Sequence, residues 1–121
     1  LHTLCVHLGL LEQERREQFQ VLTERIDQHV PRDEPMIIAG DFNDWRRRAE
    51  NHLHDDLGLE ELFVQLQGRH ARTFPVWAPL LPVDRIYYRG IEPVDCQRLC
   101  RGHWRDLSDH AALSGVFRLA S

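Results

Sequence analysis

The spacing of apolar residues changes twice within the first 39 residues, and this feature constrains the fold most. Residues 1–8 alternate between apolar and small polar side chains, as the residues of a sheet strand do. Apolar residues then recur along one face of a helix: Leu11, Phe19, Leu22, Ile26 and Val30. Pro31 ends this helix, and the apolar run at residues 35–39 is typical of a central strand buried on both faces. The chain therefore begins with a strand, a long helix and a second strand.

The rest of the chain adds a mixed helical region and several further strands. Residues 45–66 are partly helical with a break at Gly58, and the three prolines between residues 73 and 82 argue against regular structure there. Strands are expected at residues 84–89, 94–100 and 110–119, with a loop before the last of them. We therefore predict the α/β class, with a mixed sheet flanked by helices, in one domain-sized unit of 121 residues.

Composition excludes some classes of protein and leaves others open. No apolar run is long enough to cross a bilayer, so we expect no stable membrane insertion. Three cysteines cannot all pair, which favours reduced thiols and a cytoplasmic location. A zinc site built from Cys96, Cys100 and His103 stays open as an alternative, although the spacing is poor. The net charge of −4 argues against tight, non-specific binding to a nucleic-acid backbone.

Polar residues follow the central strand directly, where the chain turns at Gly40. Asp41 and Asn43 lie two residues apart and can point to one spot. The carboxylate can accept a hydrogen bond from water, and the amide can donate to a phosphoryl oxygen. A simple turn closed by these side chains is an equally good interpretation of the motif taken alone.

Three further segments carry groups suited to acid–base or metal chemistry. Asp109 and His110 precede the last strand, Asp84 begins the strand at residues 84–89, and His7 ends the first strand. Carboxylate oxygens suit magnesium, and imidazole is a common proton donor or acceptor near neutral pH. Each of these residues, considered singly, is more often an ordinary loop or strand-end residue.

The four features, in this order, resemble the endonuclease/exonuclease/phosphatase superfamily of metal-dependent phosphoesterases, and most closely its small bacterial members. The resemblance covers nearly the whole chain. It implies hydrolysis of a phosphoester or phosphodiester by in-line attack of water, with Mg²⁺ or Mn²⁺ as the cofactor. It also implies a nucleic acid or a small phosphodiester as the substrate. The alternative is a non-catalytic binding or scaffold module that retains this fold.

The resemblance implies a role for each position that matches. His7 contacts the scissile phosphate, Asp41 orients or activates the attacking water, and Asn43 holds a phosphate oxygen. Asp84 fixes the imidazole of His110, and His110 stabilises the pentacoordinate phosphorane.

Metal binding and substrate binding are expected to use further residues. Asp109 matches a metal-site carboxylate, and Asp41 contributes to the same site. Trp45 and Arg46 follow the catalytic loop and are candidates for substrate binding, since an arginine grips phosphate and an indole stacks on a ring. The alternative for these two residues is the solvated first turn of a helix.

The superfamily fold is a four-layered α/β sandwich of two similar halves, and residues 1–121 resemble its C-terminal half. The main metal ligand, a glutamate, is therefore expected in a missing N-terminal half, and the chain alone is expected to have little activity. Half a sandwich exposes a sheet face, whose apolar surface costs roughly 25 cal/mol per Å² in water. We therefore expect either self-association or the missing half to cover that face.

Overall fold

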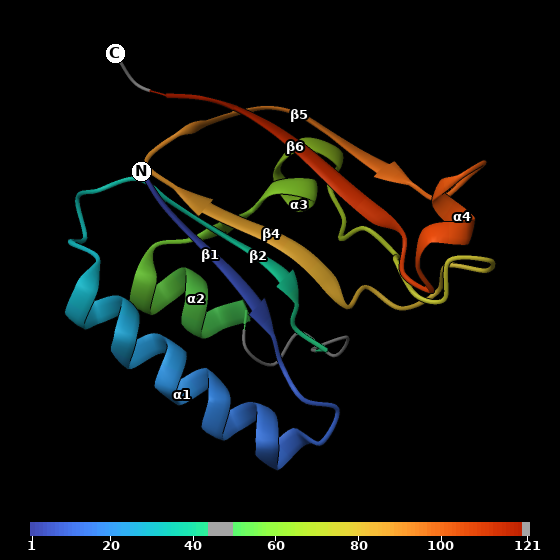
Figure 1. Cartoon of the computed structure of the whole chain (residues 1–121). Coiled ribbons are helices and arrows are strands. Elements are labelled where there is room, and N and C mark those ends of the chain that lie inside the picture. Colours follow the sequence, from blue (N-terminus) through green and yellow to red (C-terminus); the bar gives the residue numbers. More distant parts are fainter. Residues whose placement is uncertain (44–49, 120–121) are drawn as a thin grey trace.

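The computed structural model describes residues 1–43 and 50–119. Figure 1 shows strands in the middle of the molecule with helices on both sides. In chain order the elements are β1 (His2–His7), α1 (Glu12–His29), β2 (Met36–Asp41), α2 (Glu50–Leu57), β3 (Glu60–Glu61), α3 (Leu62–Gln67), β4 (Asp84–Arg89), β5 (Glu92–Leu99), α4 (Trp104–Leu107) and β6 (Ala112–Arg118). This is the mixed α/β class that the sequence predicts.

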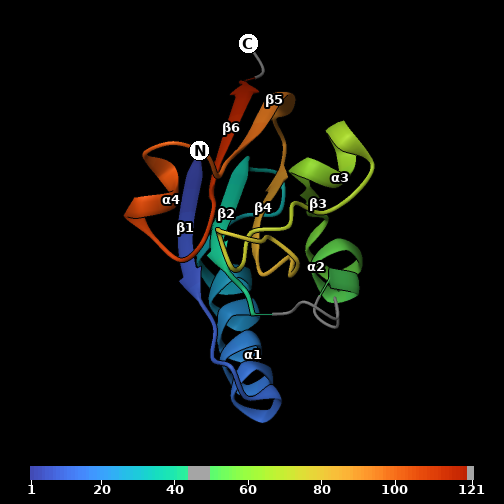
Figure 2. The ribbon, with the colours of Figure 1, turned by 90° about the vertical axis from the view of Figure 1, so that its right-hand side faces the viewer.

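The main sheet has four strands in the order β1-β2-β4-β3, which Figure 2 shows side by side. β1 and β2 are parallel and are joined by the long helix α1, whereas β4 is antiparallel to both β2 and β3. β5 and β6 form a separate antiparallel pair. Because β1 and β2 run in the same direction, the residues that follow them emerge at the same end of the sheet.

Two apolar clusters lie on opposite faces of the main sheet (Figure 1). On one face, Met36 and Ile38 of β2 pack with α1 and α2. On the other face, Ile37 and Ala39 pack with α3, β5 and β6. Alternate residues of β2 therefore enter different clusters, which explains why its sequence is apolar at successive positions.

Three boundaries differ from those expected from the sequence. Leu11 precedes α1 and is 70% exposed, so it does not belong to the buried face of the helix. β5 begins at Glu92, two residues earlier than expected, because it continues its pairing with Arg118 of β6. The loop before β6 contains the short helix α4. Among the described residues, none of the helices is both long and apolar enough to cross a membrane.

Arg89 at the end of β4 is buried and donates hydrogen bonds to three main-chain carbonyls: those of Leu57 at 2.8 Å, Pro31 at 3.1 Å and Glu34 at 3.4 Å. Arg89→Met is expected to lower the free energy of unfolding by about 2 kcal/mol, because these carbonyls lose a charged donor. Urea unfolding measures the loss. Arg118→Met is the control, since its exposed ion pair with Glu92 is worth at most about 1 kcal/mol. Equal losses in the two variants would show that Arg89 does not tie these segments together.

Candidate active site

The register of the sheet brings three of the predicted residues to one end of adjacent strands. His7 of β1 is paired with Asp41 of β2, and Asp41 is paired with Asp84 of β4. Residues that lie directly opposite each other point to the same face of a sheet. The His7 Nε2 atom lies 3.7 Å from Asp41 Oδ2. Asp41 thus occupies the centre of a row that runs across three strands.

His110 joins this row from outside the main sheet, just before β6. Its Nδ1 atom lies 2.6 Å from Asp84 Oδ2, which is a hydrogen bond. Its Nε2 atom faces the other way and lies 3.8 Å from Asp41 Oδ2. Asp84 therefore fixes the direction of the ring, and the two histidines approach the same carboxylate oxygen of Asp41.

Thr73 and Phe74, which belong to no motif in the sequence, hold this arrangement together. The Thr73 carbonyl accepts a hydrogen bond from Ala111 N at 2.7 Å, and its hydroxyl accepts one from Asp84 N at 3.3 Å. One residue therefore positions the backbone on both sides of the Asp84–His110 contact. The Phe74 ring lies 5.0 Å from the His110 ring, at an angle of 48°. Both residues lie in the proline-rich loop, where no hydrophobic period reveals a fixed conformation.

Asp41 and Asn43 close a turn after β2, and so the simple turn geometry is present at the functional motif. The Asn43 main-chain N–H donates to Asp41 Oδ1 at 2.9 Å, and Asn43 adopts a positive φ of 48°. The Asn43 side chain is buried, and its Nδ2 donates to the Leu8 carbonyl. These bonds hold the end of β2 against the end of β1. Neither of these bonds uses Asp41 Oδ2 or the amide oxygen of Asn43.

Asp109 lies beside this cluster and is more exposed than its other members. Its side chain is 75% exposed, and its Oδ1 atom lies 4.0 Å from His110 Nε2. Its main-chain carbonyl accepts a hydrogen bond from Val76 N at 2.7 Å, which anchors the loop before His110. Trp45 and Arg46, the two residues expected to bind substrate, lie outside the described residues.

Asp41, Asp84 and His110 form a group whose potential metal-ligand atoms lie within 4.8 Å of one another. Two carboxylates and an imidazole are a donor set that suits a divalent cation. No second group of this kind occurs among residues 1–43 and 50–119, so Cys96, Cys100 and His103 do not form the alternative zinc site there.

The two central groups carry shifted pKa values. Burial raises the pKa of Asp41, and the charge of Asp84 adds to this, although the Asn43 N–H and the two histidines act in the opposite direction. Burial alone would lower the pKa of His110, but the hydrogen bond with Asp84 and the nearby carboxylates outweigh it, and the pKa is raised. Both shifts favour the protonated form relative to an ordinary side chain of the same type, so the imidazole of His110 holds its proton more firmly and Asp41 is a better proton acceptor.

Asp84→Asn is expected to lower the pKa of His110, because the acceptor and its charge are lost while burial persists. Since the pKa of His110 is higher in the folded protein than its ordinary value of 6.5, its stabilising effect is present below that value. The effect is lost as the pH rises through the folded pKa. The wild type should therefore exceed Asp84→Asn in unfolding free energy more at about pH 5.5 than at about pH 8.5. Urea unfolding with EDTA measures both differences, and equal differences would refute the proposed charge coupling.

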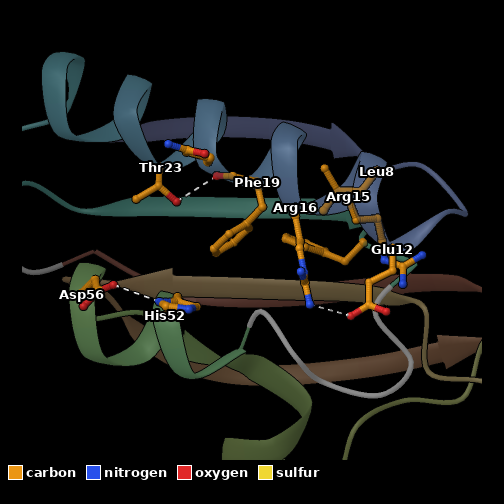
Figure 3. A pocket seen from close by; sticks show the side chains of 10 residues that line it. Leu8, Glu12, Arg15, Arg16, Phe19, Thr23, His52 and Asp56 are labelled. Carbon is orange, nitrogen blue, oxygen red and sulfur yellow. Dashed lines mark hydrogen bonds and ion pairs between the residues drawn. The ribbon is translucent and has the colours of Figure 1, made fainter.

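A cavity of about 500 Å³ lies elsewhere, between α1 and α2 (Figure 3). Four of its polar side chains form two ion pairs: Arg16 with Glu12 at 3.2 Å, and His52 with Asp56 at 3.2 Å. Phe19 points into the space between the helices. None of the four clustered site residues lines it. This cavity between the helices is therefore separate from the candidate catalytic residues.

Comparison with known sequences identifies relatives. A sequence model of the Endonuclease/Exonuclease/phosphatase family matches residues 2–110. The uncharacterized protein YbhP of Escherichia coli (strain K12) is 46% identical over 119 residues, which cover 98% of this chain and 47% of YbhP. The chain thus spans about half the length of the curated relatives that it matches over nearly its whole length.

Comparison with solved structures gives the same fold. An endonuclease/exonuclease/phosphatase family protein from Bacteroides thetaiotaomicron matches 97% of this chain and 49% of its own, with a TM-score of 0.74 and 16% identity. TDP2 of D. rerio, solved with a single-strand DNA product, matches 95% of this chain and 55% of its own, with a TM-score of 0.69 and 24% identity.

Proposed function

The chain belongs to the endonuclease/exonuclease/phosphatase family, and we propose that it supplies the histidine–aspartate part of a divalent-metal-dependent phosphoesterase site. One observation carries the proposal. The Nε2 atoms of His7 and His110 lie 3.7 and 3.8 Å from the same oxygen of Asp41, and Asp84 holds the far side of His110. A scaffold module does not require two histidines and two carboxylates to converge on one spot.

Asp41 is proposed to orient the attacking water and accept its proton, because it lies between the two histidines and burial raises its pKa. The water oxygen then forms a bond to phosphorus while the bond from phosphorus to the leaving oxygen breaks. His110, whose ring is held in place by the contact of its Nδ1 atom with Asp84, donates from Nε2 to a phosphoryl oxygen that gains charge. His7 binds a second phosphoryl oxygen, and Asn43 fixes the turn that presents Asp41 and contacts the phosphate from the same side.

Asp41 and Asp84 offer carboxylate oxygens to Mg²⁺ or Mn²⁺, and Asp109 can add a third from the rim. The ion would supply positive charge that offsets the charge of the phosphoryl oxygens. Asp84 already forms a hydrogen bond with His110, so Asp41 is the best-placed ligand for the ion among the described residues. Among residues 1–43 and 50–119, Asp41 is thus the one carboxylate of the metal-ligand group that is not bound to His110 by a hydrogen bond, which supports the expectation that a glutamate outside residues 1–121 is the main ligand.

We also propose that this chain forms the C-terminal half of a domain about twice its length, consistent with its covering 47% of YbhP. The full gene product that contains the chain is called the extended protein below. In the extended protein the other half, rather than a second copy, would cover the apolar side chains that β5 and β6 expose, Val94 and Val116. Light scattering of the 121-residue chain checks this, because uncovered apolar side chains favour self-association.

The test of the proposed function is hydrolysis by the extended protein of bis(p-nitrophenyl) phosphate and of plasmid DNA. Activity that requires Mg²⁺ or Mn²⁺, disappears with EDTA and returns with added metal is the expected result. The two substrates separate a general phosphodiesterase from a nuclease. A folded protein with no metal-dependent activity on either substrate or on a phosphomonoester would favour the scaffold alternative.

A further inference from the structure

A second cavity, of about 350 Å³, lies between the end of α3, the loop that follows it and β5. Arg69, Arg72 and Arg98 line it, together with Gln67 and His70. Figure 1 shows that the loop after α3 leads to the start of β4. The arginine cavity, as we call it, is therefore lined by the first residues of the loop that leads to Asp84.

The arginines of this cavity carry charge that no carboxylate neutralises. Among the described residues, neither Arg69, Arg72 nor Arg98 forms an ion pair, whereas Arg16 and Arg118 each contact a glutamate at 3.2 Å. Arg98 Nη1 instead donates to the Arg72 main-chain carbonyl at 3.3 Å, which ties β5 to the loop. A guanidinium has five N–H donors, so most of those of Arg98 stay available to a ligand.

The acidic residue next to the cavity is already engaged. Glu61 is buried, and its Oε2 atom accepts hydrogen bonds from Phe63 N at 2.7 Å and Val64 N at 3.2 Å. Its other oxygen faces His70 Nδ1 at 3.9 Å, and both side chains are almost completely buried. The Glu61 carboxylate therefore contacts the start of α3 and His70, and it does not form an ion pair with the arginines.

Three cations that gather around a concave surface repel one another, and a bound anion relieves that repulsion. Guanidinium groups match the oxygen spacing of phosphate and bind it in pairs of hydrogen bonds. Arg72 directly precedes Thr73, which holds the backbone at Asp84 and Ala111. Arg98 is paired with Leu113 of β6, three residues after His110. A phosphate in the cavity would thus lie beside the proposed catalytic cluster.

We infer that the arginine cavity is a phosphate-binding subsite, which holds a second phosphate group of a substrate that carries several. The binding of phosphate depends only on the cavity, whereas the link to substrate rests on the proposed function. The inference names a substrate class: short nucleic-acid strands or other molecules with neighbouring phosphates, in preference to a lone phosphodiester.

The first experiment is a titration of the extended protein with inorganic phosphate at constant ionic strength in EDTA, followed by NMR of the arginine Nε–Hε groups. Saturable shifts of Arg72 and Arg98 are expected. Arg72→Gln/Arg98→Gln should weaken binding at this site at least five-fold, while Arg16→Gln and Arg118→Gln, whose arginines have glutamate partners, should leave it unchanged. Shifts that do not saturate, or that persist equally in the double variant, would overturn the subsite.

The second experiment compares steady-state kinetics on a short single-stranded oligonucleotide and on bis(p-nitrophenyl) phosphate. Arg72→Gln/Arg98→Gln is expected to raise KM for the oligonucleotide several-fold with little change in kcat, and to leave both constants for the single phosphodiester unchanged. An equal KM change for both substrates, or none for either, would refute the role in substrate binding. If the wild type hydrolyses nothing but the arginine signals still saturate, the proposed function fails and the anion site stands.

Discussion

His110→Ala in the extended protein is expected to lower kcat for phosphodiester hydrolysis by roughly 10³-fold, the range of a positioned acid–base group. The reason is geometric. The ring is the group whose Nε2 faces Asp41 at 3.8 Å while Asp84 holds Nδ1 at 2.6 Å. Without the ring, the phosphoryl oxygens lose the donor that Asp84 holds in place. Single-turnover kinetics measure the change in the chemical step.

Two companion variants show whether the loss is specific. His103→Ala removes an exposed histidine of the same loop and should leave kcat within about two-fold, well below the effect of an acid–base group. Asp84→Asn should lose less than His110→Ala and shift the pH profile to lower pH, because Asp84 acts by positioning and charging the imidazole. If His110→Ala and His103→Ala lose equally little activity, His110 does not take part in the chemistry.

Gly40→Ala is expected to lower the free energy of unfolding by about 3 kcal/mol or more, through backbone strain and overlap together. Gly40 has a φ of +143°, and an added Cβ atom would lie 2.0 Å from the Val6 carbonyl oxygen. That oxygen belongs to the neighbouring strand β1, whose backbone cannot move without disturbing its pairing with β2. The strands that carry His7 and Asp41 would separate. Urea unfolding measures the effect.

Gly58→Ala is the matched control, because Gly58 also has a positive φ, +67°, but nothing lies within 4 Å of an added Cβ. Its cost should be limited to backbone strain, about 1 kcal/mol. A difference of about 2 kcal/mol between the variants therefore reports the overlap with β1 together with the greater backbone strain at the φ of Gly40. Similar unfolding free energies for the two would show that the strands can part enough to admit the methyl group.

The fold could be predicted from the sequence where apolar residues recur with a regular spacing. The change from alternation to helical spacing locates β1 and α1, and the wholly apolar β2 correctly indicates burial on both faces. Leu11 was wrongly placed on the buried face, because the helical spacing continues for one residue beyond the end of the helix. The short helix α4 carries no buried residue, so it leaves no apolar pattern to detect.

The site could be predicted only in part. The order of His7, Asp41, Asp84 and His110 along the chain suggests the family, and the sheet register then places the first three side by side. Thr73 forms hydrogen bonds with its main-chain carbonyl and its hydroxyl, and the ring of Phe74 packs against His110. Such roles depend on tertiary contacts that no local pattern records. The arginine cavity is similar, since its arginines lie up to 29 positions apart, from Arg69 to Arg98.

The most direct test of the central claim is the kcat of Asp41→Asn for bis(p-nitrophenyl) phosphate with saturating Mg²⁺, beside Asp56→Asn as an exposed control. Asp41 lies at the centre of the cluster, where it meets both histidines and the metal candidates. The kcat of Asp41→Asn is expected to fall by roughly 10³-fold, while the kcat of Asp56→Asn stays within about two-fold of the wild-type value. A folded Asp41→Asn variant that retains wild-type kcat would contradict the claim.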